Sequence, residues 1–233
     1  MPTLKELCST AEELAPLELS YKTVAKGGYD NSGIIVDAGR NVNKILFSLD
    51  LSEAAVNRAK RLGCDTVVTH HPAIYMPIKN LSATELVNPA VFAAVRAGIN
   101  VLSMHLNLDI AEGGIDASLA EALGATETRF LDVLEKGDPR YGYGREFAVN
   151  AAFAEIIVRA KKNLKTDRII VYGNKKDTVK ICASFCGGGS GYAETAVKTG
   201  ETEADLIVTS DMPHHVIKEL VEAGKKIMLV THY

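Results

Sequence analysis

Short apolar runs alternate with helix-like segments from Lys44 onward. The runs consist of apolar and β-branched side chains, which is typical of buried strands. In the segments between the runs, apolar positions recur with helical spacing. One helix has clear ends, with Ser52 as N-cap and Gly63 as the stop. Helices of this length between strands imply a mainly parallel sheet with covered faces. We therefore expect strand, helix, strand, helix and strand at residues 44–50, 51–63, 65–71, 89–98 and 99–109.

The second half of the chain repeats this plan after a loop rich in turn residues at 135–146. A helix is predicted next, over residues 147–164. Strands are then predicted at 168–173, 179–185, 204–210 and 227–233, with a helix at 213–226. The fold prediction is an α/β protein of two similar α/β halves, residues 1–130 and 131–233, with mainly parallel sheets and a metal site in the cleft between them.

Composition narrows the function classes. A chain of 233 residues that is 47% hydrophobic can bury a full core. The net charge of -3 gives no basic field, so nucleic acid is not favoured by charge. No apolar run approaches the roughly 20 residues that span a bilayer, and the N-terminus does not read as a signal peptide. We expect a cytoplasmic protein with no membrane role, and no disulfides among Cys8, Cys64, Cys182 and Cys186, which include no C-x-x-C pair.

Polar side chains stand where the predicted strands end, the edge at which α/β sheets bind ligands. His70 and His71 end the second strand and His232 ends the last. In the third strand, alternation puts His105, Asn107 and Asp109 on one face as a polar ladder. Such a ladder on a buried strand is costly unless its members are hydrogen-bonded or bind a ligand.

These residues favour a metal site. Adjacent imidazoles at a strand end diverge, so His70 and His71 suit two neighbouring ions, and Asp109 can bridge them as oxygen ligands do in two-metal hydrolytic sites. A lone histidine is more often a hydrogen-bonded structural residue, but all six histidines abut predicted strand ends. Histidine and carboxylate without thiolate suit Zn, Mn, Fe, Co or Ni. We expect two divalent ions per chain, with His105 either a ligand or a residue that orients one.

Other candidates carry two readings each. Asp50 is a metal ligand or shares the capping of the next helix with Ser52, and capping is favoured; Asp211 likewise has an N-cap as its default role. His214 and His215, in the first turn of a predicted helix, face the site or belong to a solvated helix start. The glycine run at 186–191 is an anion-binding turn or a tight strand-to-helix turn.

The combination of motifs resembles the Nif-three-like family, whose members are often named GTP cyclohydrolase 1 type 2 homologues. The resemblance runs over nearly the whole chain, and the double-His-Pro and H-x-N-x-D motifs make it specific. It rests on the stretches YDNSGIIVD, LDLSEAAVNRAKRLGCDTVVTHHP, SMHLNLDIAEGGID, CGGGSG, ADLIVTSDMPHH and VTHY.

The resemblance implies a dinuclear metal site of His70, His71, Asp109 and His232, with His105 close by, in two α/β halves that assemble into a ring-like homohexamer. In the family pattern a Glu four residues after the last His is a further ligand, and this sequence ends at Tyr233. The pair Ser210-Asp211, at the start of SDMPHH, stands where the family more usually has Gly-Glu or Gly-Asp.

Three functions follow from these observations. The first is a metal-dependent hydrolase in which two ions activate a water toward a small-molecule substrate, a nucleotide or a phosphoester. The second is a non-catalytic metal-binding homohexamer that presents surfaces to partners. Glu112 is the nearest candidate for a general base, and its position discriminates between these two functions. A Glu112 beside the metals favours the hydrolase, whereas a Glu112 that is only a solvated loop residue weakens it. The third, an ordinary nucleotide-binding domain built on the glycine turn, leaves the histidines unexplained.

Overall fold

The computed structural model describes residues 1–81, 88–135 and 138–232, and the chain divides into two compact units, Met1–Ala111 and Glu112–Tyr233. Each unit contains one sheet with flanking helices, so the α/β class is confirmed. The division falls before the boundary expected after residue 130. The reason is helix α6 (Ile115–Leu123), whose Leu119 and Leu123 pack into the core of the second unit.

The first unit is an alternation of helices and short strands. Its helices are α1 (Leu4–Leu14), α2 (Leu17–Ala25), α3 (Glu53–Leu62), α4 (Pro89–Ala97) and α5 (Leu106–Ile110). Its strands are β1 (Gly33–Val36), β2 (Ile45–Ser48), β3 (Thr66–Thr69) and β4 (Asn100–Ser103).

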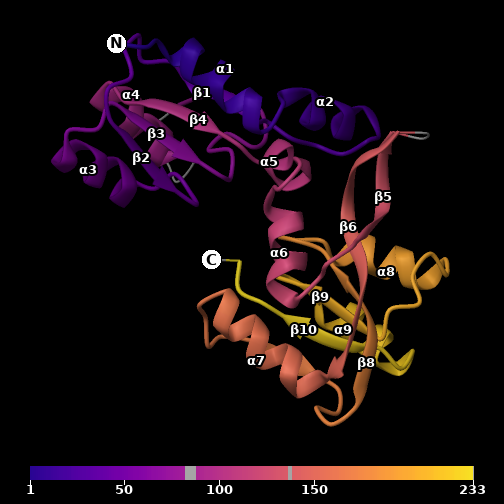
Figure 1. Ribbon diagram of the computed structural model, residues 1–233. Helices are drawn as coiled ribbons and strands as arrows, with labels where there is room; N and C mark the ends of the chain where they lie inside the picture. The colour runs from indigo at the N-terminus through magenta and orange to yellow at the C-terminus, as the bar shows by residue number, and fades with distance from the viewer. Residues whose placement is uncertain (82–87, 136–137, 233) are drawn as a thin grey trace. The chain divides into compact units, whose positions relative to one another are not determined.

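The sheet of this unit has the order β1-β4-β3-β2 (Figure 1). The pairs β2/β3 and β3/β4 are parallel, as predicted, and β1 runs antiparallel to β4. Helices α3 and α4 bury Val56 and Val91 against Val67 and Val101 of the central strands. The predicted ends of α3 are confirmed. Ser52 Oγ accepts the Ala55 N–H, and Gly63 adopts the left-handed conformation that L side chains avoid.

The second unit has a larger, mixed sheet. After α6, its helices are α7 (Phe153–Asn163), α8 (Ser190–Lys198) and α9 (His214–Glu222). Its strands are β5 (Arg129–Glu135), β6 (Asp138–Ala152), β7 (Ile170–Tyr172), β8 (Thr178–Ser184), β9 (Leu206–Thr209) and β10 (Lys226–Leu229), in the sheet order β5-β6-β8-β9-β10-β7.

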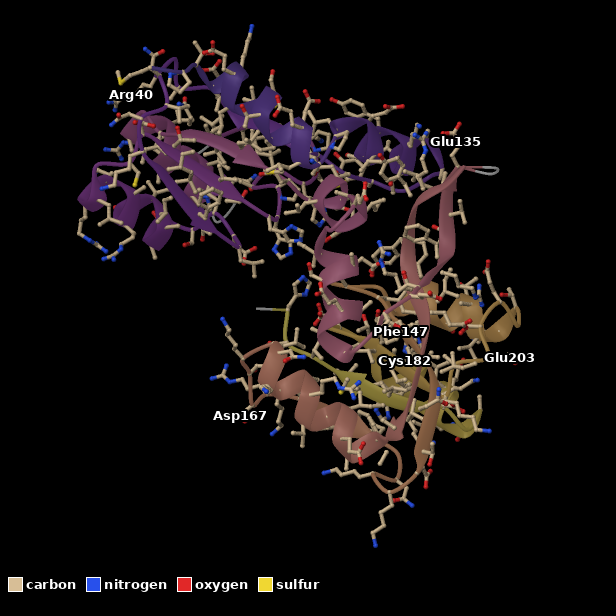
Figure 2. The ribbon with its side chains drawn as sticks, in the orientation of Figure 1. Arg40, Glu135, Phe147, Asp167, Cys182 and Glu203 are labelled. Carbon is tan, nitrogen blue, oxygen red and sulfur yellow. The ribbon has the colours of Figure 1, made fainter. Side chains whose placement is uncertain are left out.

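Helices cover both faces of this second sheet (Figure 1). Helices α6 and α7 bury one face, where Phe147 of β6 lies opposite Cys182 of β8, as Figure 2 shows. Helices α8 and α9 bury the other face around Phe185 and Ile207. Among the described strands of this unit, only the pairs β8/β9 and β9/β10 are parallel. The pairs β5/β6, β6/β8 and β7/β10 are antiparallel, so this half is less parallel than expected.

Two secondary-structure predictions in the second unit were wrong. The stretch 135–146, predicted as a loop, supplies the end of β5 and most of β6, apart from 136–137, which lie outside the described residues. Residues 147–152, predicted as the start of a helix, complete β6, and the helix begins only at Phe153. Pairing with β8 decides this segment, because it places Phe147 in the core.

The third strand of the first unit is also shorter than predicted. Strand β4 ends at Ser103, and residues 106–110 form helix α5. The prediction that His105, Asn107 and Asp109 form a polar ladder on one face of a strand was therefore wrong. Asn107 and Asp109 are both buried on this helix, and the side-chain amide of Asn107 donates to the Ala15 carbonyl at 2.7 Å.

The helices and the cysteines bear on two expectations from the composition, the lack of a membrane span and the lack of disulfides. None of the helices in the described ranges is long and apolar enough to cross a membrane. All four cysteines are free, and three of them, Cys64, Cys182 and Cys186, are buried as small core residues.

Candidate metal centre

Three histidines of the first unit come together at one edge of its sheet. His70 and His71 follow β3, and His105 follows β4. These strands are parallel neighbours, with Thr69 opposite Ser103, so their carboxyl ends meet at the same edge. Each ring offers one ligand-capable nitrogen, and these three atoms all lie within 4.8 Å of one another. The sequence placed His70 and His71 at a metal site but predicted that their rings diverge, whereas the two ring centroids lie 4.8 Å apart. It left His105 as either a ligand or a residue that orients one.

Hydrogen bonds fix the tautomer of each ring. His70 Nδ1 lies 2.8 Å from the Met104 carbonyl oxygen, which can only accept, so Nδ1 carries the proton. His71 Nδ1 lies 2.7 Å from Asp50 Oδ1, and His105 Nδ1 lies 2.7 Å from Asp30 Oδ1. In each neutral ring the lone pair is then on Nε2. The cluster offers three such nitrogens.

Asp30 is the carboxylate that orients His105. Its side chain is fully buried and also accepts hydrogen bonds from the hydroxyls of Ser20 and Ser32. Burial alone would favour the neutral acid, but the hydrogen bonds from His105, Ser20 and Ser32 outweigh it and lower the pKa of Asp30 to about 2. Asp30 is therefore an anion at neutral pH, which fixes the proton of His105 on Nδ1.

Asp50 has a different role from the one favoured by the sequence. Ser52 alone accepts the hydrogen bond from the first turn of α3, and Asp50 instead accepts from His71. The side chain of Asp50 is about half exposed, whereas that of His71 is largely covered. Asp50 thus orients a candidate ligand.

Asp109 also lies beside the cluster. It is buried in α5, and its Oδ1 is 3.7 Å from His70 Nε2. Burial lowers the pKa of His70, and the charge of Asp109 opposes that shift. The carboxylate oxygen of Asp109 and Nε2 of His70 both carry lone pairs, and the 3.7 Å between them leaves room for a cation that both could bind.

His232 has the same local arrangement in the second unit. It follows β10, and its Nδ1 lies 2.6 Å from Asp211 Oδ2, so its lone pair is also on Nε2. Asp211 was expected to cap α9. That prediction was wrong, because the N-cap of α9 is Pro213 without a side-chain bond, and the Asp211 carboxylate is taken by His232.

The remaining candidates lie in exposed positions of the second unit. His214 and His215 occupy the first turn of α9, and both are exposed. Glu112 is exposed in the loop before α6. Their exposure fits the predicted alternative of a solvated helix start for His214 and His215 and of a solvated loop residue for Glu112.

The glycine run at 186–191 forms the turn from β8 into α8. A Cβ on Gly189 would come within 2.4 Å of Phe185 Cβ, so this position requires glycine for close packing. The Gly187 carbonyl accepts from the Ser210 amide and the Thr209 hydroxyl. These contacts fit the reading of a tight strand-to-helix turn.

The side chains present suit a divalent transition metal. Metal-binding histidines characteristically donate their second nitrogen to a carboxylate or carbonyl, which raises the basicity of the ligating nitrogen. His70, His71 and His105 all do so. Sequence reasoning missed Asp30 as a member of the site and assigned Asp50 and Asp211 to helix capping. For Asp30 a signal existed in the YDNSG stretch that carried the family resemblance.

Comparisons with known proteins identify the family of this chain. The chain matches the Duf34/NIF3 (NGG1p interacting factor 3) family over residues 2–233. It is 30% identical to a Clostridium perfringens protein named GTP cyclohydrolase 1 type 2 homolog, over 99% of this chain and 85% of that protein. A Bacillus cereus protein related to NIF3 has the same fold, with a TM-score of 0.83 at 20% identity over 99% of this chain and 88% of that one. Reduced HcgD from Methanocaldococcus jannaschii gives 0.80 at 25% identity, over 99% and 87%. The protein therefore belongs to the Duf34/NIF3 family.

Proposed function

We propose that this protein is a metal-dependent hydrolase with a dinuclear divalent-metal centre, acting on a nucleotide or another small phosphoester. The observation that carries the proposal is the shared orientation of the site histidines. Each keeps its Nδ1 proton on a carbonyl or carboxylate, which puts the lone pair of the neutral ring on Nε2, the nitrogen that would ligate a metal.

The proposed ligands are His70, His71, Asp109 and His232, with His105 beside them. Bound divalent ions at such a centre polarise a substrate oxygen and lower the pKa of water. The protein's own groups hold the rings in place. Asp50 keeps the proton of His71 on Nδ1, and Asp30 does the same for His105. His232 is proposed from its motif and its pairing with Asp211.

The substrate class is inferred from the relatives. The Clostridium perfringens relative is named a GTP cyclohydrolase 1 type 2 homolog, and a second relative, from Methanocaldococcus jannaschii, carries the same name at 28% identity. Because GTP is a nucleotide, this name suggests a nucleotide substrate for the present chain as well. Two positive ions would also match the negative charge of a phosphoester.

The alternative is a non-catalytic, metal-binding homohexamer with an interaction or regulatory role. It is favoured by the exposure of Glu112, the general-base candidate from the sequence. A carboxylate in solvent lacks the environment that tunes catalytic carboxylates for proton transfer. The alternative shares the metal site with the first proposal and differs from it only in the absence of turnover.

The two functions separate in an activity screen of the metal-loaded full chain. Nucleoside triphosphates and simple phosphomonoesters would be incubated with protein reconstituted with Zn, Mn, Fe, Co or Ni, and the products separated by chromatography. The hydrolase proposal predicts turnover that falls at least 100-fold in His71→Ala and is unchanged in His215→Ala, an exposed histidine of α9. Metal binding without turnover of any substrate would favour the alternative.

A further inference from the structure

A second candidate binding site lies wholly within the second unit. A pocket of about 340 Å³ opens beside the hairpin of β5 and β6 and the loop before α6. Its lining includes Arg140, Arg145, Tyr141, Phe130 and Glu112. Two guanidinium groups and two aromatic rings therefore line one small concavity. None of these residues belongs to the histidine cluster.

Arg145 is held rigidly in this pocket. Its side chain is only 11% exposed, and its Nε lies 3.3 Å from Oδ2 of the fully buried Asp116. Its Nη1 donates to Thr128 Oγ1 at 3.0 Å, and its guanidinium carbon lies 4.5 Å from the centre of the Phe130 ring. These contacts fix the plane of the guanidinium. Nε and Asp116 Oδ2 are buried and form an ion pair without a hydrogen bond, and Nη2 makes no hydrogen bond among the described contacts.

Asp116 explains why a buried arginine is stable here. Its other oxygen accepts from the Cys186 amide at 3.3 Å, so the carboxylate is tied to the backbone at the end of β8. The pair places the Arg145 charge at the pocket wall before any ligand arrives. A preformed guanidinium binds an anion with less loss of side-chain entropy than a mobile lysine does.

Arg140 supplies a second cation from the same strand. It is exposed, and its guanidinium carbon lies 5.7 Å from the ring centre of Tyr141. A phosphate monoester accepts paired hydrogen bonds from a guanidinium fork, and two arginines line this pocket. Glu112 would repel a bare anion but can accept from a hydroxyl or amino group. The lining thus suits a molecule with a phosphate at one end and hydrogen-bond donors at the other.

We propose that this pocket binds a small phosphorylated metabolite, with its phosphate on Arg145 and Arg140 and a hydroxyl or amino group on Glu112. The volume has room for a phosphate and a few further heavy atoms. The proposal goes beyond the metal-dependent function and does not depend on it, because every residue involved belongs to the second unit.

The test is calorimetric titration of the full chain with inorganic phosphate and with ribose 5-phosphate. The protein is first stripped of metal with a chelator, which is then dialysed away, so that bound metal ions cannot capture phosphate. Ribose 5-phosphate should bind with one site per chain and more tightly than inorganic phosphate. Arg140→Gln, at an exposed position, should weaken binding about tenfold or more, the usual loss for one charge-assisted hydrogen bond.

Two further variants make the test specific. Arg145→Lys keeps the charge opposite Asp116 but loses the planar fork, so it should weaken binding while circular dichroism shows a folded protein. Arg168→Gln removes an exposed arginine that is not part of the pocket and should leave binding unchanged. No saturable binding of ribose 5-phosphate, or equal weakening by Arg140→Gln and Arg168→Gln, would overturn the proposal. Neither result would bear on metal binding by the histidines.

Discussion

At the scale of single residues, the proton position on each imidazole is the feature that prepares the site. His71 and His105 are each held by one aspartate, and His70 by a backbone carbonyl. A histidine without such a partner exchanges between tautomers, and a ligand must then select one of them. The aspartates therefore contribute to metal affinity without touching the metal.

Asp30→Asn tests the most buried of these partners. Removing a charge that accepts hydrogen bonds from His105, Ser20 and Ser32 should lower the free energy of unfolding of metal-free protein by roughly 1–3 kcal/mol at pH 7. Urea unfolding measures this. The matched control is Asp167→Asn, whose carboxylate is 99% exposed and pairs only loosely with Lys161, so it should change stability by less than about 0.5 kcal/mol.

The stabilisation by Asp30 should also depend on pH in a defined direction. Its pKa is about 2 in the folded protein and about 4 in an unfolded chain. Because folding lowers the pKa, the stabilisation is complete above about pH 4 and is lost as the pH falls from about 4 to about 2. The difference between wild type and Asp30→Asn should shrink over that window. A difference that stayed constant down to pH 2 would contradict the low pKa.

At the scale of elements, the sequence predicted best where local signals and tertiary packing agree. Helix α3 has a serine cap and a glycine stop, and both are observed. The segment after Ser103 was mispredicted because its alternating leucines fit a strand as well as a short helix, and only contacts with distant residues choose between them. Asn107, for example, is bonded to the carbonyl of Ala15. Asp30 was missed for the same reason, since 75 residues separate it from His105.

Ser52→Ala tests whether the N-cap of α3 stabilises the first unit, which carries the histidine cluster. Loss of the Ser52 hydroxyl leaves the Ala55 N–H without its partner, so unfolding should become easier by about 1 kcal/mol. Chemical denaturation monitored by circular dichroism measures the change. Ser52→Asp, which can accept the same bond, should restore most of the stability. No loss in the alanine variant would mean that solvent satisfies this amide equally well.

At the scale of the whole molecule, each unit has a complete sheet and its own core. In the second unit both faces of the sheet are buried by helices of that unit, around Phe147 on one face and Phe185 on the other. A separate fragment of residues 112–233 should therefore fold cooperatively, as autonomous domains do. Far-ultraviolet circular dichroism and a sigmoidal urea transition would show this. A fragment with a gradual, non-cooperative transition would contradict the division into units.

The central claim, a metal centre built on oriented histidines, is tested most directly by metal content per chain. Protein purified without chelator or affinity-tag metal would be measured by elemental analysis, beside the variants His70→Ala and His71→Ala and the control His215→Ala. We predict about two divalent ions per wild-type chain, fewer in each site variant and no change in the control. Absence of metal from the wild type, or equal content in wild type and both site variants, would contradict the account and make the cluster a structural feature.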